Sequence, residues 1–236
     1  MKEFFTSRPF AKIGLLAIPM IIFMLIMEKL FPKVSPEGFQ SFIIAFEFAK
    51  TPDQLHNMFS GFNTPDFNNL DIGNHYDFGF MLSYCLFLFL LFRKAALIFR
   101  QKWLLIGAVL SVIILLADFS ENLALLKLTR IYSPTLPDNE LIPLLYRLHM
   151  ITWIKWGGLA ICFALYSIKL LGKKLLLTIE GVALILPAIF SIWALTGSPQ
   201  GISKFTLSIT LAFALLILYC FHFKERSTES ENAAFI

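Results

Sequence analysis

Six long apolar stretches constrain this chain more than any other feature of its sequence. Each holds, or comes close to, the about 20 residues that an α-helix needs to cross the hydrocarbon core of a bilayer. They are residues 13–31, 76–99, 103–126, 149–171, 175–196 and 203–223. We therefore predict an all-α, polytopic membrane protein with six transmembrane helices.

The composition agrees with this fold class and excludes a soluble globule. Hydrophobic residues make up 57% of the 236 residues and charged residues 15%, which leaves too little polar surface to face water on all sides. The net charge of +4 does not indicate a nucleic-acid partner, because the basic residues gather in short loops between the apolar stretches. The partner that the composition predicts is the lipid bilayer.

The loop charges predict how the chain is oriented. Residues 93–102 carry four basic and no acidic residues, residues 169–174 carry three basic residues, and residues 32–75 carry two basic and five acidic ones. Because cytoplasmic loops are enriched in Lys and Arg, we expect both termini in the cytoplasm and segment 32–75 outside. The expected location is the cell membrane, inner or plasma.

A single membrane domain, residues 1–224, accounts for nearly the whole chain, and residues 225–236 form a polar tail that we expect to be disordered and cytoplasmic. No small-x-small cleavage site follows the first apolar stretch, so we interpret it as a retained signal anchor. The three cysteines lie on different predicted spans and indicate packing residues rather than a disulfide framework.

Segment 32–75 is expected to form a helical flap over the outer face. In "EGFQSFIIAFEFAK", the apolar residues recur at helical spacing while Gln40, Glu47 and Lys50 face elsewhere, which predicts an amphipathic helix in the outer interface. "TPDQ" at 51–54 predicts a helix start with a capping box. "TPD" recurs at 64–66 and predicts a second turn or short helix. The alternative is a connector that follows the membrane surface without a function.

Polar residues interrupt the third apolar stretch at "ADFSEN", residues 117–122. Asp118, Glu121 and Asn122 share one helix face. A carboxylate at the bilayer centre costs about 2.5–3.5 kcal/mol on insertion scales, so this face is expected to point into the bundle. Lys155 of the fourth stretch lies at a matching depth.

Asp77 and Tyr84 of the second stretch reach a similar level, which predicts a buried polar pocket in the outer half of the membrane. Trp153 and Trp156 flank the lysine, and they either line a site for an amphiphile or anchor the helix at the interface. The predicted ligand-binding residues are Asp77, Tyr84, Asp118, Glu121, Asn122, His149, Trp153, Lys155 and Trp156.

These residues leave several functions open. A purely architectural ion pair is one interpretation, but two carboxylates facing one ammonium leave a surplus charge that favours a functional site. Our leading hypothesis is the binding or transport of a small or amphipathic ligand, with a lipid among the candidates. The alternatives are a membrane-embedded enzyme acting on an outer-leaflet lipid, with Asp118, Glu121 or His149 as acid/base groups, and a structural partner of another membrane protein. The sequence identifies no catalytic residue and no cofactor.

Other polar residues have simpler interpretations. His56, His75 and His149 could join Asp118 or Glu121 around zinc, but no zinc-binding spacing supports this, and no metal is predicted. "DFNNLDIGNHYD", 66–77, departs from a calcium-binding loop and predicts a polar turn. Glu180 is interpreted as structural and neutralised by Lys173 and Lys174, which lie in the preceding loop.

Overall fold

The computed structural model describes residues 7–172 and 174–224, and within these ranges the regular structure is helical, without a strand. Six segments of the described chain are long and apolar enough to cross a membrane. They are Ala11–Leu30, Thr64–Ile98, Lys102–Ile131, Asp138–Leu170, Leu175–Ala194 and Pro199–His222. The prediction of an all-α, multi-pass membrane protein is therefore confirmed. The predicted tail, 225–236, lies outside the described residues, as does Lys173.

Two of the six segments are interrupted ahead of a proline, the first near its beginning and the fifth near its middle. The first consists of α2 (Ala11–Gly14) and α3 (Ala17–Leu30), and the fifth of α9 (Leu175–Ala183) and α10 (Leu186–Ala194). Pro19 and Pro187 cannot donate the backbone hydrogen bond to the residue four positions earlier, so each break lies just before its proline.

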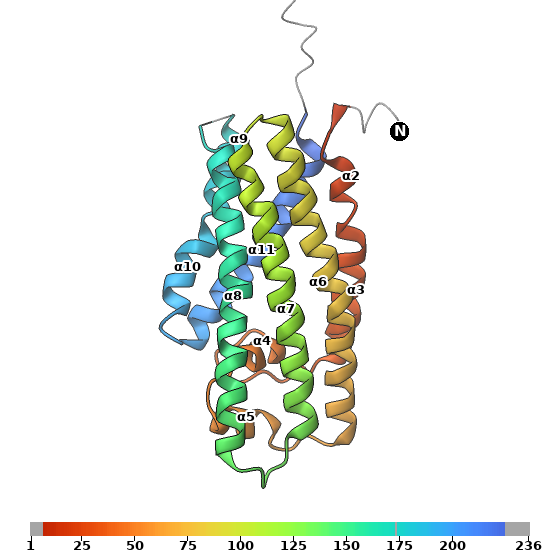
Figure 1. The fold of residues 1–236 in the computed structure, drawn as a ribbon, viewed down its shortest axis with the longest axis vertical. Helices are drawn as coiled ribbons and strands as arrows, with labels where there is room; N and C mark the ends of the chain where they lie inside the picture. The colour runs from red at the N-terminus through yellow and green to blue at the C-terminus, as the bar shows by residue number, and fades with distance from the viewer. Residues whose placement is uncertain (1–6, 173, 225–236) are drawn as a thin grey trace, which may run out of the picture.

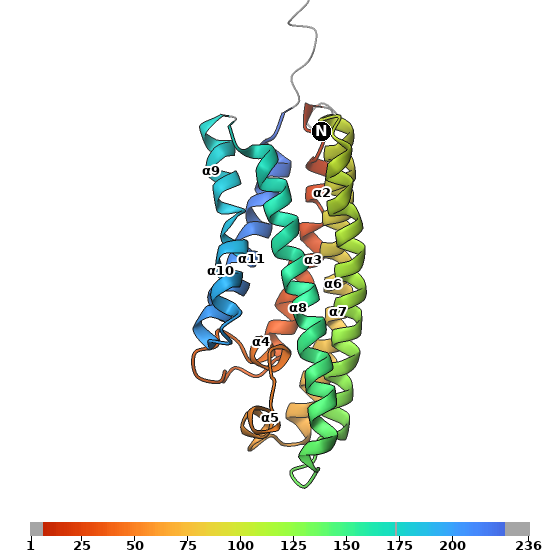
Figure 2. The same cartoon turned by 60° about the vertical axis from the view of Figure 1, so that its left-hand side comes forward.

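Three long helices pack side by side in the order α6 (Thr64–Ile98), α7 (Leu105–Ile131) and α8 (Asp138–Leu170). With 35 residues, α6 extends about 52 Å, well beyond the roughly 30 Å of a hydrocarbon core. All three project past α3 and α10 at one end of the molecule (Figures 1 and 2). The last helix, α11 (Pro199–His222), packs against α10 and α8.

The projecting ends of α6, α7 and α8 carry the flap, so we name this end the flap end. The opposite end, where α2 begins and α11 ends, is named the terminal end (Figure 1). The flap contains α4 (Phe42–Glu47) and α5 (Pro52–Phe59). In α5 the predicted capping box is present: Thr51 accepts from the Gln54 amide, and the Gln54 side chain accepts from Thr51. The sequence prediction of a helical flap is confirmed.

The flap differs from prediction at its second boundary. The repeated "TPD" does not start a short helix but begins α6 itself, with a capping box between Asn63 and Asp66. The polar stretch 66–77 is therefore helix rather than turn, and the fourth segment likewise begins at Asp138. Hydropathy detects only the apolar part of a helix, whereas these helices continue as amphipathic helices beyond the apolar belt.

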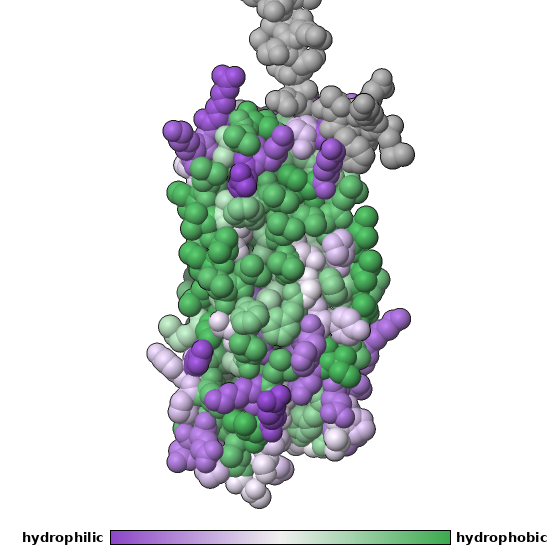
Figure 3. Space-filling view, turned by 45° about the vertical axis from the view of Figure 1, so that its right-hand side comes forward, coloured by the Kyte–Doolittle hydropathy of each residue, from purple (hydrophilic) through white to green (hydrophobic). Residues whose placement is uncertain are grey.

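Apolar side chains cover the middle of the molecule, and hydrophilic ones gather toward both ends (Figure 3). Inside the flap end, a separate core of aromatic and leucine side chains joins α4 and α5 to the projecting helices. The flap is thus tied to the bundle by its own core.

Elsewhere close helix packing depends on small residues: a Cβ on Gly79 of α6 would lie 2.3 Å from the ring of Phe23 of α3.

Candidate functional site

Lys155 of α8 lies at the centre of a buried charged cluster near the flap end. Its ammonium lies 3.1 Å from Glu47 Oε2 and 3.3 Å from Asp118 Oδ1, and it pairs directly with Glu121 Oε2. The side chains of all four residues are at most 8% exposed. One ammonium is therefore shared by three carboxylates, which come from α4 and α7.

Two contacts join α6 to this cluster. The hydroxyl of Tyr84 donates to Asp118 Oδ2, and the side-chain amide of Asn122 donates to Asp77 Oδ2 at 2.6 Å. The structure thus brings together six of the predicted residues: Asp77 and Tyr84 of α6, Asp118, Glu121 and Asn122 of α7, and Lys155 of α8. That these residues bind a ligand stays a prediction.

Glu47 reaches the cluster from the flap, which corrects the prediction for segment 39–50. We expected an interfacial helix with Glu47 turned toward water, but α4 is inserted beside α7 and α8 and Glu47 is only 6% exposed. Ser41 caps the helix by accepting from the Ile44 amide. The other residues of α4 are buried as well, except for the partly buried Ile43, so the helix exposes little surface to solvent.

The Glu47 carboxylate is held by several groups. Besides Lys155, it accepts a hydrogen bond from Trp156 Nε1 at 2.8 Å. Burial raises the pKa of Glu47 above its ordinary value, Lys155 opposes this, and the nearby negative charge of Asp118 adds to it. Protonation of Glu47 is therefore easier in the folded protein than in water.

Thr152 connects the two glutamates in a way that bears on their protons. Its hydroxyl oxygen lies 2.5 Å from Glu121 Oε1 and 3.0 Å from the backbone carbonyl oxygen of Glu47. A carbonyl can only accept, and the hydroxyl has a single proton to donate. Both hydrogen bonds reach full strength together only when Glu121 Oε1 carries a proton and donates to Thr152.

The charges of the cluster do not balance. Glu47, Asp77, Asp118 and Glu121 supply four carboxyl groups, whereas Lys155 is the one cation that the structure places among them in the described chain. A surplus of buried negative charge is costly in a low dielectric. The cluster is therefore suited to hold protons or a cationic group in addition to Lys155.

His149, Trp153 and Trp156 lie along α8 next to the cluster. Trp156 is part of it, since its indole also lies 5.1 Å from the Lys155 ammonium, in cation–π contact. Trp153 donates instead to His149 Nε2 at 3.1 Å and stacks on Phe205 of α11. Trp153 and His149 thus form a separate pair one turn closer to the flap.

The alternative zinc set is not assembled. His56 lies beside Tyr132 and Asp138, His75 bonds the carbonyl oxygen of Asp71, and His149 bonds Trp153. Among residues 7–172 and 174–224, no three His, Cys, Asp or Glu side chains are placed to hold a metal ion. The zinc alternative therefore has no geometric support.

Sequence reasoning missed three residues of this region: Glu47, Thr152 and Asn74. Glu47 had a signal, because it is the single charge within the apolar run "FIIAFEFA". Thr152 had none, since a threonine in a span is ordinary. Asn74 is 1% exposed on α6, one turn before Asp77, and neither of its side-chain polar atoms has a hydrogen-bond partner in the described chain.

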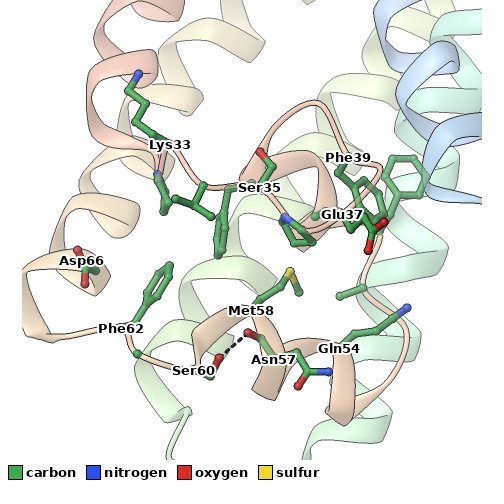
Figure 4. A pocket seen from close by; sticks show the side chains of 18 residues that line it. Lys33, Ser35, Glu37, Phe39, Gln54, Asn57, Met58, Ser60, Phe62 and Asp66 are labelled. Atoms are coloured by element: carbon green, nitrogen blue, oxygen red, sulfur yellow. Dashed lines mark hydrogen bonds between the residues drawn. The ribbon is translucent and has the colours of Figure 1, made fainter.

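A cavity of about 840 Å³ lies on the flap side of α4. Its lining combines apolar side chains, among them Phe42, Ala45 and Met58, with a polar rim that includes Gln54 and Asn57. Figure 4 shows Met58 and Phe62 pointing toward the stretch from Lys33 to Phe39, whereas Lys33 points away. Ala45 and Ala49 line this cavity while Glu47, between them in sequence, contacts Lys155, so α4 separates the cavity from the charged cluster.

None of the predicted ligand-binding residues lines this cavity. Trp153 instead borders a smaller apolar groove of about 380 Å³ between α8 and α10.

Comparisons with family models, curated proteins and solved structures found no match to the chain. The candidate site is therefore defined by its own chemistry.

Proposed function

We propose that this protein binds a small or amphipathic ligand at its flap end and couples binding to protonation of the Lys155 cluster, either as a receptor or as part of transport. One observation carries the proposal: α4 lines the 840 Å³ cavity with Phe42 and Ala45 and places Glu47 against Lys155. A ligand that displaces α4 must change the environment of Glu47.

The cavity supports an amphipathic ligand. Its apolar floor can hold a hydrocarbon portion, and its rim offers amide, hydroxyl and carboxylate groups from Gln54, Asn57, Ser60 and Asp66. By the charge distribution of the loops, we place this end on the outer side of the cell membrane. A ligand would then reach the cavity from outside or from the outer leaflet.

The surplus of carboxylates supports the coupling to protons. Ligand binding that moves Glu47 away from Lys155 leaves the ammonium to Asp118 and Glu121 and exposes Glu47 to the cavity. Because burial raises the pKa of Glu47, its proton is released when it meets water. Binding is therefore linked to proton release and is weaker at low pH.

The test uses a dansyl-labelled alkylamine as probe and protein in lipid nanodiscs. Its fluorescence anisotropy reports binding between pH 5.5 and 8. Met58→Trp fills the cavity and is expected to weaken binding at least tenfold, whereas Ala188→Trp in the α8–α10 groove leaves binding unchanged. Glu47→Gln is expected to bind the probe with a flatter pH dependence.

The proposal is wrong if Met58→Trp and Ala188→Trp affect binding equally, or if Glu47→Gln keeps the full pH dependence. The same variants also separate this function from a purely architectural ion pair. An architectural role predicts that Glu47→Gln changes stability but not the response of binding to pH.

A further inference from the structure

A second group of buried polar side chains lies at the terminal end, where α8, α9 and α11 meet. Glu180 of α9 has a 7% exposed side chain and lies 3.3 Å from His222 Nε2 of α11. Tyr166 of α8 and Tyr219 of α11 are fully buried, and the ring of Tyr219 lies 5.7 Å from that of His222. Lys174, expected to neutralise Glu180, is exposed, so the neutralising partner that the structure shows is His222.

The hydrogen bonding of His222 fixes where its protons lie. Nδ1 lies 2.9 Å from the carbonyl oxygen of Leu218, and because a carbonyl only accepts, Nδ1 carries a hydrogen. Nε2 therefore faces Glu180 Oε1 either bare or protonated. A bare nitrogen and an ionised carboxylate 3.3 Å apart would be two acceptors facing each other, so the pair requires a proton between them.

The pair itself is poor in hydrogen-bond partners. Glu180 Oε2 and His222 Nε2 are buried and lack a well-formed hydrogen bond to any described residue, and the buried hydroxyl groups of Tyr166 and Tyr219 interact with each other. Cys220 is also buried here. Buried polar atoms of native proteins are normally hydrogen-bonded, so unbonded ones at one place indicate a site that takes up protons or water.

An aromatic layer separates this group from the Lys155 cluster. From His222, ring contacts run edge-on to Tyr219, then to Tyr166, and end at Phe92. From the flap end, Tyr84 contacts Phe213, which contacts Phe163. Along α8, Lys155 and Tyr166 are about 16 Å apart. The buried core between the two groups is apolar and includes Phe87, Phe92 and Phe163.

We propose that Glu180 and His222 form a proton-binding site that exchanges with water at the terminal end and is insulated from the Lys155 cluster by this aromatic layer. The side chain of His222 is 34% exposed and brings the pair close to water, whereas its Nε2 and Glu180 Oε2 are buried. The described chain thus has a buried set of protonatable side chains near each end.

The test is nuclear magnetic resonance of protein in nanodiscs at pH 7.5, labelled with ¹⁵N at histidine and ¹³C at the glutamate carboxyl. Loss of one histidine signal in His222→Asn assigns the ring. We expect a protonated Nδ1 and a proton shared between Nε2 and Glu180. In Glu180→Gln the proton at Nε2 is lost while Nδ1 keeps its own. Glu140→Gln, on an exposed residue of α8, serves as the matched control and leaves the ring unchanged.

A wild-type spectrum with a bare Nε2 and an ionised Glu180 overturns the proposal without any variant, so a folding defect cannot obscure the answer. Insulation is tested by Glu121→Gln. It should leave the His222 signals in place, and a change as large as that of Glu180→Gln overturns the insulating layer. Neither result depends on whether the flap cavity binds a ligand, because the spectra are recorded without one.

Discussion

The two ends of the bundle place carboxylates beside a basic nitrogen in opposite ways. Near the flap end, three carboxylates share Lys155, every partner is at most 8% exposed, and α4 closes the cluster. At the terminal end, one carboxylate meets one imidazole whose side chain is 34% exposed. The first arrangement has surplus charge and is shut off from water, and the second is balanced and lies beside a partly exposed ring.

The difference teaches that burial alone does not define a site. A balanced, open pair can gain or lose its proton to solvent with little structural change. A closed cluster with surplus charge can do so only when something opens it, and in this protein the closing element is a six-residue helix that also borders a cavity. The following predictions test this contrast, beginning with the largest expected effect.

Lys155→Met should lower the free energy of unfolding far more than the matched substitution at the terminal end. It leaves three buried carboxylates facing one another, and breaking a buried ion pair by removing one partner costs about 3–5 kcal/mol. Denaturant titration in detergent measures the free energy of unfolding. Adding Glu47→Gln, Asp118→Asn and Glu121→Gln should restore most of the lost free energy of unfolding.

His222→Gln is the matched substitution at the terminal end, and its expected cost is within about 1 kcal/mol. Equal costs for the two single variants would remove the contrast.

Trp156→Phe should be more costly than Trp153→Phe. The indole of Trp156 donates to the carboxylate of Glu47, and losing a hydrogen bond to a charged group costs about 1.5–3 kcal/mol. Trp153 donates to neutral His149, so its loss is expected to cost about 0.5–1.5 kcal/mol. The same denaturant titration compares them. A larger cost for Trp153→Phe would mean that Glu47 does not depend on its Trp156 contact.

The stability of the wild-type protein should fall relative to Glu47→Gln as pH rises. The folded pKa of Glu47 is raised by burial, so above its ordinary value of 4.5 the folded state binds more protons than the unfolded state. Stability is then lost with rising pH, by at most about 1.4 kcal/mol per pH unit, until the folded pKa is passed. Unfolding titrations of both proteins from pH 4.5 to 8 measure the difference. A difference that stays constant, or reverses, contradicts the inferred burial of Glu47.

Thr51→Ala should have the smallest effect and confine it to the flap. It removes the N-cap of α5, which costs about 1 kcal/mol. Hydrogen exchange should accelerate in α5 and α4 while amides near His222 keep their protection. Thr135→Ala, on an exposed residue of the α7–α8 loop, is the control. Faster exchange throughout the bundle would show that the flap does not open independently.

Much of this architecture follows from the sequence because lipid imposes a simple rule. Spans of about 20 apolar residues are long enough to recognise without a structure. The grouping of Asp118, Glu121 and Lys155 was likewise predictable, since charged side chains at matching depths cannot face hydrocarbon.

What the sequence did not reveal depends on tertiary packing. An interfacial helix was predicted where α4 is inserted, because the periodicity of 39–50 says which residues share a face but not what covers the opposite one. His222 as the partner of Glu180 was missed for a related reason. Lys174 is closer in sequence, but the partner is set by the packing of α11 against the fifth segment, which no local pattern encodes.

The unbroken course of α6 has a mechanical consequence. A single 35-residue helix holds Phe67 in the aromatic core of the flap and, farther along, presents Tyr84 to Asp118. A helix of this kind acts as a stiff lever, so a tilt at its flap end carries the phenol of Tyr84 with it. A movement of α6 at the flap end therefore reaches the Lys155 cluster directly through the helix, without a series of small side-chain shifts.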